Sequence, residues 1–428
     1  MKSPQIHSNL LLLGLTLYLC SSLTSMAGMS IGFVLLVGLA LSGGWTPQRM
    51  KVLFQNPETR SFTVLSLLFS GVCILSLIFS AVRPPFFAGH APQVHLLKDS
   101  FKLWYMILPF FLASILHSLR PEQRREALQR WLLFAGFCGL VGVFQFFTGL
   151  PRKQIIPSIP QFYHATLFFG HHLSTASILI FPFFVSLSLF FSGQLKEVRT
   201  RRINTAIALL SGITLILTWS RMLWIALPLG LTPFLIRAFK PRFRKWVFLS
   251  GLTAGLFFLC FFELNRPSLQ DSFFHQRGTN ERVALWEANL AFIQKRPLLG
   301  IGLRKSEEMA YYYFLETRPQ SAASQFVGHA HNNALEILSG TGILGFITWL
   351  LWNLWILLTA LQVSRLYSSQ GKPLESAVAF GLFCAWITFH INGLTQVNFW
   401  EGKVMHQMMW SAGLLIFLKL NLLTEKKM

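Results

Sequence analysis

Charged side chains are scarce in this sequence of 428 residues: they form 12% of it, whereas soluble proteins carry about 25%. Acidic residues are the rarest, with 16 Asp and Glu against 37 Lys and Arg, and the only aspartates are Asp99 and Asp271. Hydrophobic residues fill 53% of the chain, and the mean hydropathy is +0.50. This composition excludes a soluble enzyme, a disordered protein and a disulfide scaffold, and it leaves a polytopic helical membrane protein. The shortage of aspartate also argues against an aspartate-rich metal site.

Cysteine offers neither a metal-ligand spacing nor a disulfide pattern. Each cysteine lies inside an apolar stretch, where it behaves as a small hydrophobic residue. The cysteines therefore say nothing about the redox compartment. They are Cys20, Cys73, Cys138, Cys260 and Cys384.

Apolar windows of about 17–25 residues recur along the whole chain and predict membrane helices. We predict an all-α polytopic membrane protein with about twelve spans, forming a single integral membrane domain over residues 1–428. The first span follows Lys2, as in a signal peptide, but it lacks a clear small-x-small cleavage site, so we expect a retained helix. The predicted spans are 9–27, 30–45, 61–82, 101–118, 131–149, 173–192, 203–219, 222–239, 246–263, 333–360, 375–394 and 403–420.

The positive charges alternate between successive loops. Loops on one side hold 22 of the 37 Lys and Arg residues, and the positive-inside rule places that side, with both termini, in the cytoplasm. A net charge of +21 would suggest nucleic acid as the partner of a soluble protein. Here membrane topology explains most of it, and we expect no nucleic-acid partner.

The longest predicted loop, residues 264–330, joins spans nine and ten on the outer side. Part of it predicts an amphipathic helix, which Pro297 ends. Its apolar stripe would lie on the membrane surface or cap the bundle. The stripe consists of Val283, Trp286, Leu290 and Ile293.

Two arginines stand in otherwise apolar surroundings on the predicted outer side. Arg221 interrupts the turn between spans seven and eight, and Arg282 precedes Trp286 by one helical turn. A guanidinium presents a planar fork of donors that matches phosphate oxygens. The alternatives are that Arg221 only extends to water and that Arg282 only pairs with Glu281 or Glu287.

The strongest polar motif is the run Gly328-His329-Ala330-His331-Asn332-Asn333 at the start of span ten. Asn333 is the predicted N-cap of that helix, and Glu336 completes a pattern like a capping box. His331 would then lie just before a helix N-terminus. A neutral imidazole among arginines and a helix dipole has a lowered pKa, which suits a general base; a plain capping residue is the alternative. The glycines that follow favour close helix packing, with a local break as the alternative: Gly340, Gly342 and Gly345.

Together these motifs resemble the bacterial O-antigen ligase and O-antigen polymerase superfamily. The resemblance rests on three segments in order: Ser220-Arg221, then Arg282-x-x-x-Trp286 with a downstream Pro-Leu-x-Gly-Ile-Gly, then His331-Asn332 followed by Gly342-x-x-Gly345. It implies a glycosyltransferase of the bacterial inner membrane that works at the periplasmic face. The donor would be a glycan on undecaprenyl diphosphate, and the acceptor a sugar hydroxyl of lipid A–core. The reaction would be metal-independent and inverting, without a cofactor.

The resemblance also implies roles for individual residues. Arg221 and Arg282 would bind the donor diphosphate, and His331 would deprotonate or orient the acceptor hydroxyl. Candidate supporting residues are Asn332, His329, Trp286, His171 and His172.

Other polar residues carry open alternatives. A metal site, an acceptor-contacting loop and an ordinary polar helix start all fit His164, His171 and His172. Either a wall of the same cavity or a solvated loop fits His390, Asn392, Gln396, Asn398 and Glu401. Acceptor phosphate binding or plain loop charge fits Arg152 and Lys153.

The motifs leave three other functions open. A polymerase for O-antigen or exopolysaccharide, and a protein O-oligosaccharyltransferase, belong to the same superfamily and share its motifs. A lipid-linked glycan transporter also fits a chain with many spans and a cationic cavity. Transporters tend to have repeated halves with broken helices at matching positions, and the long interval between spans nine and ten has no counterpart in the first half, which favours an enzyme. The motifs do not specify the glycan, the acceptor sugar or the oligomeric state.

Overall fold

The computed structural model describes six stretches of the chain and a few isolated positions. The predicted span 246–263 falls almost entirely outside them, as does the first part of the predicted outer loop, up to residue 276. The described residues are 4–82, 87–157, 159–193, 197–238, 277–319 and 328–426, with 245, 246, 249 and 253.

Helices form almost all of the regular structure in these stretches, where the only β-structure is two isolated bridges. They are α1 (Pro4–Ser21), α2 (Met26–Ser42), α3 (Pro47–Gln55), α4 (Pro57–Ala81), α5 (Leu96–Ser100), η1 (Phe101–Met106), α6 (Leu108–Ser118), α7 (Pro121–Thr148), α8 (His172–Phe191), α9 (Val198–Leu217), α10 (Arg221–Ala238), α12 (Arg277–Lys295), α13 (Ser306–Thr317), α14 (Asn333–Ser369), α15 (Pro373–Asn392) and α16 (Gly402–Lys426).

Six helical segments of the described chain are long and apolar enough to cross a membrane. The number rises to seven if α2 and α3, which meet at a bend of 99°, count as one broken span. Every predicted span except 246–263 overlaps a described helix. The structure therefore agrees with a polytopic helical membrane protein, while twelve spans stay a prediction.

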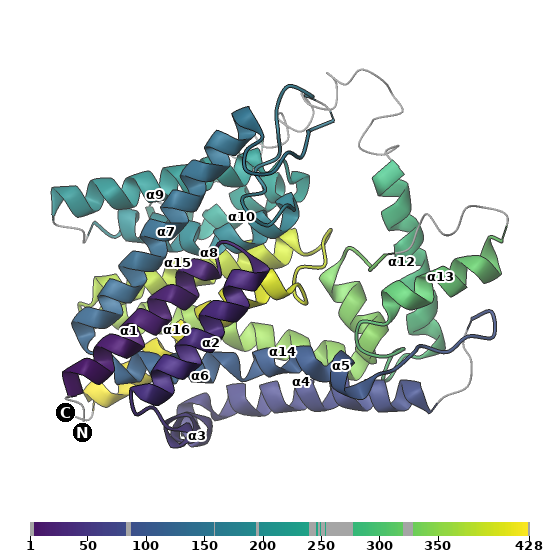
Figure 1. The fold of residues 1–428 in the computed structure, drawn as a ribbon, viewed down its shortest axis with the longest axis horizontal. Coiled ribbons are helices and arrows are strands. Elements are labelled where there is room, and N and C mark those ends of the chain that lie inside the picture. Colours follow the sequence, from purple (N-terminus) through teal and green to yellow (C-terminus); the bar gives the residue numbers. More distant parts are fainter. Residues whose placement is uncertain are drawn as a thin grey trace.

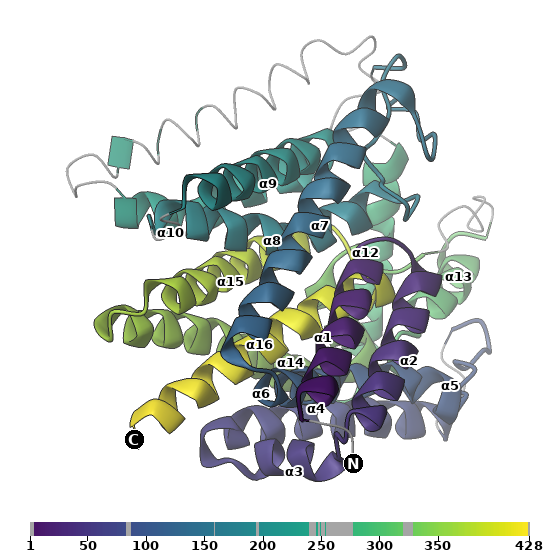
Figure 2. The same ribbon diagram turned by 60° about the vertical axis from the view of Figure 1, so that its left-hand side comes forward.

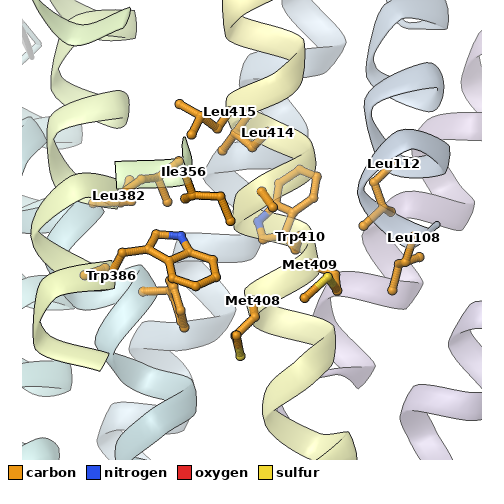
Figure 3. Packing of buried hydrophobic residues seen from close by; sticks show 14 of the residues in the cluster. Leu108, Leu112, Ile356, Leu382, Trp386, Met408, Met409, Trp410, Leu414 and Leu415 are labelled. Carbon is orange, nitrogen blue, oxygen red and sulfur yellow. The ribbon is translucent and has the colours of Figure 1, made fainter. Parts of the chain in front are cut away.

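The helices pack into a bundle around α8, α15 and α16 (Figure 1). α8 packs on α15, α6 on α16, and α14 on both α4 and α15. α9 and α10 lie at one edge, away from α3 and α4, in both views (Figure 2). The core between the central helices is aromatic: Trp386 of α15 and Trp410 of α16 are buried on either side of Ile356 (Figure 3).

α12 and α13 form a separate unit beside the N-terminal half of α14, with a small apolar core of their own. Two residues of the predicted stripe, Val283 and Leu290, are 54% and 51% exposed, which agrees with a stripe at the membrane surface. The helix packs against α13 through a neighbouring face, which combines two alanines with two large apolar side chains. The packing face consists of Ala284, Leu285, Ala288 and Phe292.

α14 is broken at Gly342, whose φ of 65° and ψ of −172° are not helical. At the break, the N–H groups of Ile343 and Leu344 donate to the carbonyls of Pro297 and Leu298, at 2.8 and 3.4 Å. A local break was the less favoured alternative in the sequence, and the structure contains one.

The carbonyls that this break frees are bonded by the same neighbouring turn. The Ser339 carbonyl accepts from Ile301 N–H at 2.9 Å, and the Gly340 carbonyl accepts from Gly302 N–H at 3.0 Å. The turn after α12 therefore takes up hydrogen bonds that a continuous helix would make internally. Close approach requires glycine on both sides, because a Cβ on Gly300 would lie 2.5 Å from the Gly340 carbonyl.

We predict that Gly342→Ala destabilises the protein by about 2–4 kcal/mol. A Cβ there would lie 2.2 Å from the Leu298 carbonyl oxygen, and the backbone conformation is one that only glycine adopts readily. The measurement is thermal unfolding in detergent. Gly71→Ala in α4 is the matched control, because its Cβ would meet nothing within 4 Å, and its melting temperature should not fall. Equal melting temperatures for both variants would refute this account of the break.

Candidate functional site

The N-terminus of α14 is capped one residue earlier than predicted. Asn332 is the N-cap, and its side chain accepts from the N–H groups of Ala334 and Leu335, at 2.9 and 3.1 Å. The predicted cap, Asn333, instead accepts from the backbone N–H groups of Asn398 and Phe399. Tertiary contacts thus decide which of two adjacent asparagines caps the helix.

Glu336 does not complete a capping box. Its buried carboxylate accepts from Ser306 Oγ at 2.6 Å and from Ala330 N–H at 3.1 Å. The carbonyl of Ala330 in turn accepts from Trp286 Nε1 at 2.8 Å. The backbone just before His331 is therefore held at both its donor and its acceptor, by α14 and by α12.

His331 is the next residue, and it has a positive φ of 46°, which few non-glycine residues adopt. The backbone N–H of His331 donates to Nδ1 of His329 at 3.3 Å, and the two rings lie 4.3 Å apart. Nδ1 of His331 is buried and has no hydrogen-bond partner among the described residues. Strained backbone of this kind clusters at functional sites, which makes His331 a candidate for a functional residue.

A cavity of about 290 Å³ opens beside His331. Helix starts form much of its wall, because the residues at the N-termini of α8, α14 and α16 all contribute to it. Its lining residues are Met26, Lys102, His171, Leu173, Arg304, Glu307, His329, His331, Glu336, Gln396, Val397, Trp400, Glu401, Gly402 and Lys403.

The imidazole of His331 is neutral at physiological pH. Burial is the main cause that lowers its pKa to about 3, and the electrostatic influence of His329 and Arg282 adds to this effect. The ring therefore binds a proton only as the pH falls far below its ordinary value of about 6.5. A neutral imidazole in a cavity can accept a proton or orient a hydroxyl group.

His171 lines the same cavity, and two other histidines stack behind it. The rings of His171 and His172 lie 5.4 Å apart, and those of His172 and His164 lie 4.2 Å apart. Nδ1 of His164 lies 2.9 Å from the Thr218 carbonyl. Burial lowers the pKa values of His171 and His164, so these rings are also neutral.

Ser174 connects His171 to Glu401. The hydroxyl of Ser174 donates to the Glu401 carboxylate and lies 3.4 Å from Nδ1 of His171. Lys403 is the ion-pair partner of Glu401 at 3.9 Å. The structure therefore brings His171, His172, His329 and His331 into one cluster.

Arg282 and Arg221 have different relations to this cluster. Arg282 lies on α12, is partly buried, and acts electrostatically on both His331 and His172. Burial lowers its pKa, but a guanidinium stays charged. Arg221 is the first residue of α10, just after the turn whose Thr218 carbonyl contacts His164. Neither arginine lines the described cavity, so their approach to a shared ligand stays a prediction.

The described residues contain no group of three or more His, Cys, Asp or Glu side chains arranged to hold a metal ion. Gln396 and Glu401 line the cavity, whereas Asn392 and Asn398 are buried and donate to Ser177 Oγ. His390 is packed beside two tryptophan rings instead. The exposed side chains of Arg152 and Lys153 do not line this cavity.

Sequence reasoning missed several cavity residues. Lys102 carried a usable signal, since it is a cation within a predicted span. Lys403 likewise begins an apolar span. Arg304 gave no signal, because its exposure to the cavity depends on a turn with φ of 59°.

Two comparisons with known proteins bear on the motifs around Arg221, Arg282 and His331. A model of the O-antigen ligase family matches residues 206–350. This stretch, about a third of the chain, is similar to that family. It contains Arg221, Arg282, His331 and the broken part of α14. The chain is also 23% identical over 372 residues to a Rickettsia conorii (strain ATCC VR-613 / Malish 7) protein that is provisionally named a polysaccharide ligase, covering 84% of this chain and 79% of that protein.

Both comparisons confirm the predicted resemblance to the O-antigen ligase superfamily. They support polysaccharide ligation or polymerisation as the class of activity. Within the family segment, Trp286 joins the Arg282 helix to the backbone beside His331.

We predict that Trp286→Phe lowers the rate of glycan transfer by roughly tenfold or more, because a misplaced catalytic group reacts slowly. The ring remains, but the hydrogen bond to the Ala330 carbonyl is lost. The measurement is transfer by purified protein at saturating substrates. Trp352→Phe is the matched control, since its Nε1 donates to Ser66 Oγ at 3.0 Å between α14 and α4, away from the cavity. An equal loss of rate in both variants would indicate general destabilisation and contradict a role for Trp286.

Proposed function

We propose that this protein transfers a glycan from undecaprenyl diphosphate to a sugar hydroxyl of lipid A–core, as an O-antigen ligase. The observation that carries the proposal is His331: a neutral imidazole, strained and partly buried, beside a cavity and within electrostatic reach of Arg282. The family segment supports a polysaccharide ligase or polymerase.

The proposed step forms a bond between the acceptor oxygen and C1 of the donor sugar and breaks the bond from C1 to the diphosphate oxygen. The acceptor proton passes to the His331 imidazole, and undecaprenyl diphosphate leaves with the electron pair. Attack opposite the leaving group inverts C1. Arg221 and Arg282 stabilise the negative charge that grows on the diphosphate, so we propose a reaction that needs no metal.

We place the cavity on the periplasmic face of the bacterial inner membrane. In the predicted topology, spans six, eight, ten and twelve all begin at the outer side. The helices that correspond to them, α8, α10, α14 and α16, begin near His171, Arg221, His331 and Lys403. Three of these starts contribute to the cavity wall, which supports an outward-facing site with both termini cytoplasmic.

We predict that His331→Ala abolishes transfer, because the acceptor hydroxyl loses its base. Cells carrying this variant should accumulate intact lipid-linked glycan at the periplasmic face while lipid A–core stays undecorated. The measurement is the lipid-linked pool and the decoration of lipid A–core. His90→Ala is the matched control: this exposed histidine stacks on Tyr312, outside the cavity, and its loss should leave transfer intact.

Other outcomes of the His331→Ala experiment point to the alternative functions. Chains that still attach but stay one repeat long would identify a polymerase. Lipid-linked glycan that is trapped on the cytoplasmic face would identify a transporter. Either result would overturn the ligase proposal.

We predict that Arg282→Ala and Arg221→Ala each abolish transfer without loss of membrane insertion, since the diphosphate loses a bidentate partner. Lysine at either position should restore only part of the rate, because it lacks the planar fork. The measurement is transfer at rising donor concentration. Arg318→Ala is the control, since this exposed arginine pairs with Glu287 on the surface. A variant with a normal rate would remove that arginine from the diphosphate role.

A further inference from the structure

Two cations of the cavity wall have no part in the proposed transfer step. Lys102 lies on η1, and Arg304 lies in the turn before α13. In the part of the chain that the structure describes, neither forms an ion pair with a carboxylate, whereas the neighbouring Lys305 pairs with Asp99 at 2.8 Å. The Lys102 ammonium is held in place by the Trp400 carbonyl at 2.6 Å.

These two cations are close enough to repel each other. Like charges that lie close together repel each other, and a bound anion relieves this repulsion. Three carboxylates also line the cavity: Glu336 is bonded to Ser306 and Ala330, and Glu401 attracts Lys102 but also binds Ser174 and Lys403. The third, Glu307, lies in the first turn of α13, where the helix dipole favours it.

Electrostatic interactions connect the cation pair with the histidines of the same cavity. Lys102 acts on Arg304 and on Glu401, and Glu401 acts on His171. His171 in turn acts on His331, which also has Arg282 as a neighbour. The cation pair and His331 thus line one cavity, while Arg282 acts on His331 without lining it.

We propose that Lys102 and Arg304 form a subsite that binds a phosphate group on the acceptor glycolipid. This inference rests on the proposed function, in which Arg282 serves the donor diphosphate. The cation pair then holds the acceptor from the other end, with its reactive hydroxyl at His331. An ammonium and a guanidinium side by side suit the several oxygens of a phosphate monoester. Lys102 also lies at the predicted outer end of its span, on the same side as the cavity.

The test is equilibrium binding of lipid A–core to the full-length protein in nanodiscs of neutral lipid, without donor. The glycolipid is used in its phosphorylated form and after phosphatase treatment. Lys102→Gln and Arg304→Gln should each raise the Kd of the phosphorylated form roughly ten- to a hundredfold, the effect of one lost charged hydrogen bond. The phosphatase-treated form should bind the unaltered protein as weakly as the phosphorylated form binds these variants.

Two further variants separate charge from folding. Lys102→Arg and Arg304→Lys keep the positive charge and should retain most of the affinity. Lys98→Gln removes an exposed cation of α5, outside the cavity wall, and should bind as the unaltered protein does. Loss of binding in the charge-conserving variants, or in Lys98→Gln, would overturn the subsite.

Two other results would also overturn it: equal binding of both glycolipid forms by the unaltered protein, and equal competition by an anionic phospholipid, which would assign the pair to bilayer head groups. Because the measurement needs no turnover, it is independent of the transfer reaction. Correct phosphate-dependent binding without any transfer would count against the proposed function and leave the subsite standing.

Discussion

The break in α14 at Gly342 is the constraint on which the rest of the site depends. In an unbroken helix, the carbonyls of Ser339 and Gly340 would accept from the N–H groups of Ile343 and Leu344. Here all four groups bond to the turn after α12 instead, so no backbone group is lost and two segments become one unit. Each such bond contributes only about 0.5–1.5 kcal/mol, but leaving any one unmade in a buried place would cost more. The exchange therefore fixes α12 against α14 with little tolerance.

The attachment of α12 to α14 explains why Arg282 on α12 can act electrostatically on His331, which lies just before α14. Ser76 Oγ donates to the Gly340 carbonyl at 2.6 Å and Ser80 Oγ to the Ile301 carbonyl at 2.5 Å, so α4 supports both sides of the junction. From this base, α12 extends Trp286 to the Ala330 carbonyl, while Glu336 holds the Ala330 N–H. The strained backbone at His331 persists because its neighbours are bound on every side.

Motifs that carry side-chain chemistry were predictable from the sequence, and backbone pairings were not. His331 stands out because polar groups in apolar surroundings are rare. The hydrogen bond between Gly302 and Gly340 involves only backbone atoms. The glycines in the sequence therefore indicated a close approach but not which segment makes it. Asn332 and Asn333 are equally good caps, and contacts from the segment before α16 separate their roles. The cavity around Arg304 likewise depends on a turn that no periodicity reveals.

The charge arrangement has a consequence for the proposed reaction. Burial accounts for most of the lowered pKa of His331, and the positive charge of Arg282 adds to it. An isolated imidazole with so low a pKa is a weak base. A diphosphate bound at Arg282 would bring negative charge to this place and raise the pKa of His331 towards its ordinary value. In the proposed mechanism, the base gains strength when the donor is present, which links proton removal from the acceptor to occupation of the donor site.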